Sequence, residues 1–272
     1  MNDHTAETAE PWLVELLVHS DPGPLVRKHL SLAKVLALSG ACKALHKLVL
    51  DETTRARNLW TDANAEVKQV FRVSKCVSFW CMYRAAESGY LSMLAYLHEH
   101  GCEWDETTCV LAAKNGQLDC LQYAHENGCP WDEDTCDAAA EKGHLDCLQY
   151  AHEHGCPWDD FTCWEAAANG HLDCLRYAHD HGCPWNDETC FVAAKYGRLN
   201  CLQYLHEHDC PWDEETCYAA AEKGHLDCLQ YAHENGCPWN RVTCRFAAIG
   251  GHLACLQYLR ENNCPGWEEE CV

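Results

Sequence analysis

The chain has few basic residues for its size, and their distribution is uneven. It contains 20 lysines and arginines against 42 aspartates and glutamates among 272 residues. Residues 1–75 hold 10 basic against 9 acidic residues, whereas residues 76–272 hold 10 against 33. An acidic surface repels phosphate backbones, so the second part is a poor candidate for binding nucleic acid. A protein or peptide that carries basic groups is the more natural partner.

Signals for export or membrane insertion are also missing. No stretch approaches the roughly 18 consecutive apolar residues that a membrane-spanning helix needs. The first ten residues include Asp3, Glu7 and Glu10 instead of the basic segment of a secretory signal, and no Asn-x-Ser/Thr acceptor occurs. We therefore expect an intracellular protein, cytoplasmic or also nuclear, with no membrane contact.

Motifs for catalysis are absent as well. The chain has no glycine-rich phosphate loop, no nucleophile elbow and no His-Glu-x-x-His. Paired acids such as Glu214 and Glu215 are explained by the first turn of a helix, where the helix dipole favours negative charge. We expect neither an enzyme nor a cofactor.

What the sequence does contain is a repeat of 27 residues. The segment Gly128-Cys-Pro-Trp-Asp132 returns unchanged at residues 155–159, and with one change each at 182–186, 209–213 and 236–240. Clear copies begin at residues 101, 128, 155, 182, 209 and 236, a weaker copy spans about 74–100, and a truncated copy starts at Asn263. A fixed period of this length indicates a solenoid, in which stacked units bury one continuous core.

Each copy has the pattern of two short helices. In residues 128–154, Asp132 is placed to cap a first helix, and Gly143 ends it. A second helix begins near Leu145, and Gly155 ends it. The apolar faces are formed by Cys136, Ala139, Ala140, Leu145, Cys147, Leu148 and Ala151. Neither helix can bury its apolar face alone, so copies must stack. Trp131 and its equivalents are the natural large plugs between neighbouring copies.

Residues 134–156, with their Ala-Ala-x-x-Gly-His stretch, resemble an ankyrin repeat, and the resemblance covers about residues 74–272. The period is 27 instead of about 33. The missing residues fall between Asp132 and Cys136, where that family has its β-hairpin. The resemblance implies an all-α solenoid of about seven helix pairs with shortened loops. The Gly-Cys-Pro-Trp-Asp signature is similar to the expanded ankyrin families of large DNA viruses and some protists.

The N-terminal part differs from the repeats. We expect residues 1–10 to be disordered and residues 11–73 to form a small helical region. Part of this region resembles an F-box, which implies binding to a Skp-type adaptor and a role as substrate receptor of an SCF-type ubiquitin ligase. The residues that would contact the adaptor are Leu30, Leu32, Val35, Leu36 and Leu38. The alternative is a plain helical cap that shields the first repeat from water.

The 23 cysteines allow two interpretations. Eighteen of them recur three per copy at apolar positions, which indicates small buried core residues. The alternative is a thiol-rich metal-binding or redox-responsive protein, with His144 and Cys147 presenting two zinc ligands from one helix. Gln117 and Arg198 replace that histidine in two copies, which disfavours metal. We therefore expect no metal site, and structural histidines.

Two positions of the first helix vary while the framework repeats. We expect positions 137 and 138 and their equivalents to face outward and to bind a protein partner with basic and apolar groups, the chain itself being a monomer. Three successive copies carry Trp164, Phe191 and Tyr218 at one position, here called the aromatic stripe. Large aromatic residues dominate binding hot spots. The candidate binding residues are Asp137, Trp164, Glu165, Phe191, Tyr218 and Arg245.

A substitution distinguishes the two hypotheses for the N-terminal region. If it is an F-box, Leu36→Asp abolishes adaptor binding and leaves the repeats folded. If it is only a cap, the wild type binds no adaptor, and the same change exposes the first repeat and promotes aggregation. Titration of a Skp-type adaptor into both proteins, with light scattering to follow aggregation, separates the outcomes.

Overall fold

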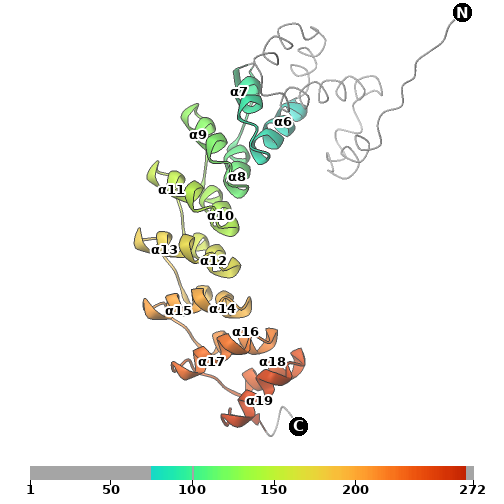
Figure 1. Cartoon of the computed structure of the whole chain (residues 1–272), viewed down its shortest axis with the longest axis vertical. Helices are drawn as coiled ribbons and strands as arrows, with labels where there is room; N and C mark the ends of the chain where they lie inside the picture. Colours follow the sequence, from blue (N-terminus) through green and yellow to red (C-terminus); the bar gives the residue numbers. More distant parts are fainter. Residues whose placement is uncertain (1–74, 100, 268–272) are drawn as a thin grey trace, which may run out of the picture. The chain divides into compact units, whose positions relative to one another are not determined.

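The computed structural model describes residues 75–99 and 101–267. Within these ranges the regular structure is entirely helical, and α6 to α19 form seven successive helix pairs (Figure 1). The expected all-α architecture of about seven helix pairs is therefore confirmed. The expected tail at 1–10 and the region at 11–73 lie outside the described residues. None of the helices in the described ranges is both long and apolar enough to span a lipid bilayer.

The chain divides into two compact units. Among the described residues, the first comprises 75–84, 92–99 and 101–104, and the second comprises 85–91 and 105–267. The first helix pair is α6 (Lys75–Glu87) and α7 (Leu91–Glu99). In the first unit Met82, Leu94 and Leu97 are fully buried, and the ring of His98 stacks on Trp104 with 3.9 Å between centroids.

The second unit contains six helix pairs in one stack. The first helices of the pairs are α8 (Glu106–Lys114), α10 (Glu133–Lys142), α12 (Asp160–Asn169), α14 (Asp187–Lys195), α16 (Glu214–Lys223) and α18 (Arg241–Gly250). The second helices are α9 (Leu118–Glu126), α11 (Leu145–Glu153), α13 (Leu172–Asp180), α15 (Leu199–Glu207), α17 (Leu226–Glu234) and α19 (Leu253–Glu261). Neighbouring first helices contact one another along one side of the stack, and the second helices line the other side (Figure 1).

The helix ends follow the sequence signals. Asp159 and Asp213 accept hydrogen bonds of 2.9 and 2.8 Å from the backbone N–H two residues later, which satisfies an orphan donor at each helix start. Asp132 occupies the same capping position in extended backbone, but its side chain makes no capping bond. Gly143 ends α10 with φ of 73°. A side chain is strained in that conformation, and a Cβ there would also collide with the ring of His171.

The cysteines are core residues that also join neighbouring copies. Between residues 102 and 264 no cysteine forms a disulfide, and all but Cys102 are buried. The thiol of Cys156 donates to the backbone carbonyl of Asp132 at 3.1 Å, and that of Cys183 donates to the carbonyl of Asp159 at 3.0 Å. The same bond recurs from the cysteine of each Gly-Cys-Pro-Trp segment in the stack. It ties each copy to the residue that starts the previous first helix.

A histidine, a tryptophan and a tyrosine form a second recurring tie. The ring of His125 stacks on Trp131 with 3.8 Å between centroids, and its Nδ1 lies 3.0 Å from the hydroxyl of Tyr150 in the next copy. Burial lowers the pKa of His125, so the neutral ring is favoured near neutral pH. The equivalent groups are His152–Trp158–Tyr177, His179–Trp185–Tyr204, His206–Trp212–Tyr231 and His233–Trp239–Tyr258. The tryptophans are half-buried links between copies instead of fully buried plugs.

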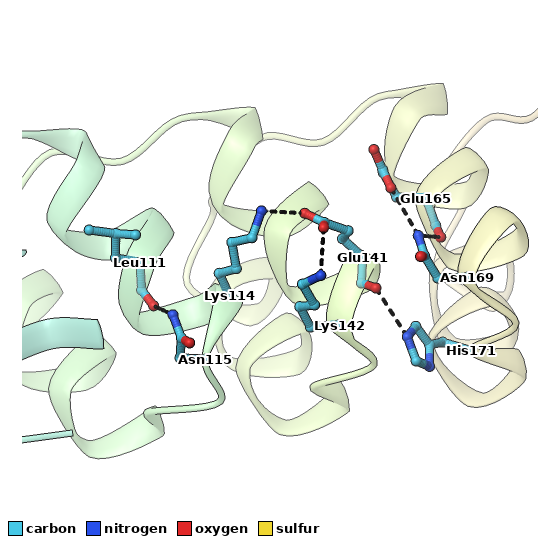
Figure 2. Close-up of polar contacts among 8 residues, drawn as sticks. All are labelled: Leu111, Lys114, Asn115, Glu141, Lys142, Glu165, Asn169 and His171. Atoms are coloured by element: carbon cyan, nitrogen blue, oxygen red, sulfur yellow. Dashed lines mark hydrogen bonds and ion pairs between the residues drawn. The ribbon is translucent and has the colours of Figure 1, made fainter. Parts of the chain in front are cut away.

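One histidine of the Gly-His stretch, His171, bonds backbone, which is the structural role expected. Nε2 of His171 lies 3.0 Å from the carbonyl oxygen of Glu141 in the preceding copy. Where this histidine is replaced, Nε of Arg198 donates to the carbonyl of Ala168 at the same distance. Figure 2 shows the contact of His171 with the backbone carbonyl of Glu141, together with the carboxylate of Glu141, which pairs with Lys114 and Lys142 at 2.7 and 2.8 Å.

A single departure from glycine gives a stability prediction. Asp209 has φ of 60°, whereas the five copies that begin at residues 101, 128, 155, 182 and 236 have glycine at this position. Asp209→Gly should raise the free energy of unfolding by about 0.5–1 kcal/mol, because a left-handed conformation strains residues with a Cβ. The reverse change, Gly182→Asp, should lower it by a similar amount, since a Cβ there meets open space and only the backbone matters. Urea denaturation measures both, and equal midpoints for all three proteins would contradict the argument.

Candidate protein-binding face

Only a narrow strip of each first helix faces outward. In α10, all positions from 135 to 140 except 137 are buried: Thr135, Cys136, Ala138, Ala139 and Ala140. At about 100° per residue this leaves Asp137, Glu141 and the first-turn Asp134 toward solvent. The reason is that a first helix inside the stack is covered by its own second helix and by a first helix on each side.

The expectation that position 138 and its equivalents face outward is therefore wrong for much of the column. Ala138, Val192 and Ala219 are 6%, 2% and 0% exposed. At this position Glu165, by contrast, is only half-buried. Position 137 does reach the surface, and it is the position that carries the aromatic stripe. The candidate surface is one residue wide on each helix, not two.

The three side chains of the aromatic stripe are half-buried and partly packed against neighbours. Trp164 lies on α12, Phe191 on α14 and Tyr218 on α16. The rings of Phe191 and Tyr218 have centroids 6.1 Å apart, and Tyr218 stacks on Phe246 at 5.1 Å. The axes of helices in contact are roughly 8–10 Å apart. The rings of Phe191 and Tyr218 are therefore closer together than the helices that carry them.

Sequence reasoning missed one aromatic residue of this surface. Phe161 is 57% exposed, and its ring centroid is 6.2 Å from that of Trp164. It lies three residues before Trp164, which places both side chains on the same helix face. The other copies offered a signal, because the equivalent residue is polar in four of them: Thr107, Asp134, Glu188 and Glu215.

A hollow of about 260 Å³ lies against the aromatic stripe between α12, α14 and α16. Its lining combines aromatic or apolar groups with carboxylates: Trp164, Phe191, Val192, Lys195, Asp187, Glu188, Asp213 and Glu215. The ammonium group of Lys195 lies 5.3 Å from the centre of the Phe191 ring. Burial, together with a hydrogen bond to the carboxylate of Glu215, raises the pKa of Tyr218 to about 12. The hydroxyl of Tyr218 is therefore neutral and donates to Glu215.

Asp137 stands apart from the aromatic stripe. Burial raises its pKa to about 7, and the nearby acids Asp159, Asp134 and Glu165 act in the same direction. The hydroxyl of Thr162 in the next copy donates to its carboxylate and opposes part of that rise. Asp137 therefore changes its charge near neutral pH.

The remaining two candidates on this face differ in exposure. Glu165 accepts a hydrogen bond from the side-chain amide of Asn169 at 3.1 Å (Figure 2), and burial raises its pKa. Arg245 is exposed on α18, near the end of the stack.

Two other expectations concern metals and the adaptor. Within residues 75–99 and 101–267 there is no group of three or more histidines, cysteines, aspartates or glutamates that could hold a metal ion. The adaptor-contact candidates lie outside the described residues: Leu30, Leu32, Val35, Leu36 and Leu38.

Stacked pairs of antiparallel helices joined by tight turns place the described part of the chain in the class of ankyrin-type solenoids, and comparison with known proteins supports this assignment. Residues 217–260 match the family model "Ankyrin repeats (many copies)". The crystal structure of the human ASB11 ankyrin repeat domain is similar, with a TM-score of 0.55 and 19% sequence identity. The match covers 65% of this chain and 96% of that domain. The comparison with curated proteins gave no match.

The raised pKa of Asp137 gives a pH-dependent prediction. A carboxyl group whose pKa rises on folding stabilises the folded state below its ordinary pKa, and this contribution is lost as the pH rises through the folded value. Asp137→Asn should therefore stabilise the protein at pH 8, where the wild type holds a buried charge. The advantage should be smaller at pH 5 by roughly 1–2 kcal/mol.

Thermal or urea unfolding at the two pH values measures this difference. Asp119→Asn, on the exposed first turn of α9, is the control and should shift stability equally at both. An advantage of Asp137→Asn that does not change with pH would contradict the assignment.

Proposed function

We propose that the protein is an interaction scaffold that binds a protein partner on the face of α12, α14 and α16, with the aromatic stripe as the main contact. The observation that carries the proposal is the row formed by Phe161, Trp164, Phe191 and Tyr218 along an otherwise acidic surface. Residues at core positions of this solenoid are nearly identical from copy to copy, whereas the residue at the position of Trp164, Phe191 and Tyr218 differs from copy to copy. A position that is free to vary is one the fold does not need.

The chemistry of the face favours a partner with both apolar and basic groups. Half-buried aromatic rings offer apolar area together with defined edges, and such side chains dominate hot spots. Carboxylates surround them, including Asp187, Glu188 and Asp213. Since the attraction between exposed charges is screened by salt, association should slow as ionic strength rises.

The test is affinity capture from a eukaryotic lysate with the wild type and two triple variants. Trp164→Ala, Phe191→Ala and Tyr218→Ala together should abolish capture, because single hot-spot aromatics often contribute about 2 kcal/mol or more. The matched control changes Arg176, Gln203 and Gln230 to alanine, one on the second helix of each of the same three copies. It should retain the partner.

Folding must be checked before capture is interpreted. The rings of the aromatic stripe are half-buried, and each contacts another aromatic ring, so the triple variant should lose some stability, roughly 1–3 kcal/mol, and stay helical by circular dichroism. Full retention of the captured protein by the folded stripe variant would refute the proposal. Equal loss in both triple variants would also refute it, because the stripe would then have no special part in binding.

We further propose that the N-terminal region binds a Skp-type adaptor, which would make the protein a substrate receptor of an SCF-type ubiquitin ligase. The support is the similarity of Leu30-Ser-Leu and the residues after it to an F-box. Recovery of adaptor and cullin with the wild type, and their loss with Leu36→Asp, are the expected results. A wild type that recovers neither protein would leave residues 11–73 as a cap.

A further inference from the structure

We propose that the hollow beside Trp164 and Phe191 is a binding site for an arginine side chain presented by the partner. The inference rests on the proposed function, because it names the chemical group that the same face would receive. The arginine site requires a basic group on the partner, whereas the proposed function would also hold for a partner that binds the aromatic stripe through apolar groups alone.

The floor of the hollow can hold a cation above aromatic rings. Trp164 and Phe191 are half-buried, and the buried side chain of Val192 also lines the hollow. The chain's own Lys195 already places its ammonium 5.3 Å from the centre of the Phe191 ring and 5.7 Å from that of Tyr196. Tryptophan is the strongest aromatic acceptor for such contacts. Trp164 contacts Phe161 and offers a further ring beside this lysine.

The rim supplies negative charge that the described residues do not neutralise. Asp187 and Glu188 come from the first turn of α14, and neither forms an ion pair with another described residue. Asp213 and Glu215 come from the start of α16. One oxygen of Asp213 caps its helix, and Glu215 accepts the hydroxyl of Tyr218. Four carboxylates and one lysine leave the hollow strongly negative, although each carboxylate keeps further acceptor sites.

Arginine fits this combination better than lysine. Its planar guanidinium can stack on an indole and donate to carboxylates in the ring plane at the same time. A lysine ammonium is more strongly hydrated and lacks the flat surface. The acids of α14 and of the start of α16 line the same hollow as Trp164, so a side chain lying on Trp164 has carboxylates within that hollow.

The test uses defined peptides and the full chain labelled with 5-fluorotryptophan. The fluorine resonance of Trp164 is assigned by its absence in Trp164→Phe. Three acetylated and amidated pentapeptides, Gly-Gly-X-Gly-Gly with X as arginine, lysine or citrulline, are titrated at about 150 mM salt, where long-range attraction is screened. The arginine peptide should shift the Trp164 resonance with millimolar affinity. The uncharged citrulline peptide should bind at least fivefold more weakly, and lysine should fall between them.

Matched variants separate the hollow from general acidity. Asp187→Asn with Glu188→Gln should weaken the arginine peptide about five- to tenfold. Glu133→Gln with Asp134→Asn removes the acids at the same two positions of α10, outside the hollow, and should change the affinity less than twofold. Equal losses in both double variants would overturn the site, as would equal binding of citrulline or an unmoved Trp164 resonance. Lysine binding as tightly as arginine would overturn the choice of arginine.

Failure of this inference is distinguishable from failure of the proposed function. If the triple alanine variant loses its captured partner and the arginine peptide leaves Trp164 unchanged, the scaffold function stands and the arginine site is wrong. If the peptide binds as expected and the triple variant keeps its partner, the hollow binds arginine, but the aromatic stripe is not the partner surface.

Discussion

The structure depends on one constraint: a helix pair of 27 residues cannot bury its own apolar faces, so every copy is stabilised by its neighbours. Three kinds of tie join neighbouring copies of the stack, and the first two recur from copy to copy. A cysteine thiol bonds the carbonyl of a capping residue, a histidine stacked on tryptophan meets the tyrosine of the next copy, and a second histidine meets a carbonyl near the helix end. All three join adjacent copies only. Stability is therefore a sum of local terms, and each junction repeats the same chemistry.

The same constraint shapes the proposed binding face. Because neighbouring copies cover a first helix on both sides, only a strip around position 137 reaches solvent, and this strip is the part of the helix that can change without cost to the core. Asp137, Trp164 and Tyr218 occupy the same position of the repeat in three different copies. The rings of the aromatic stripe lie on the first helices of three successive copies, α12, α14 and α16. Acidic residues at the starts of α14 and α16 line the hollow beside Trp164 and Phe191. Residues that cap helices thus also set the charge of the surface.

Cysteine and histidine are abundant here for reasons of packing. The thiols fill small spaces where helices approach closely, and burial raises the pKa of Cys147 to about 12, which makes the nucleophilic thiolate scarce at neutral pH. The histidines stack and bond between copies. Each recurring cysteine or histidine position serves packing or bonding within the stack, and this explains the even spacing of these residues in the sequence better than a ligand set does.

The repeat period, the small residues at i, i+3 and i+4, and the glycine stops determined the helix pairs and their order, because these signals act within a few residues. They could not determine how wide the outward strip is, since the burial of Ala138 and Val192 depends on the helix in the next copy. The contact of Phe191 with Tyr218, the hollow lined by Trp164 and Phe191, and the raised pKa of Asp137 likewise arise between copies. Local pattern specifies a helix and its apolar face, whereas packing at the crossing of two helices decides which side chains meet, and with what charge.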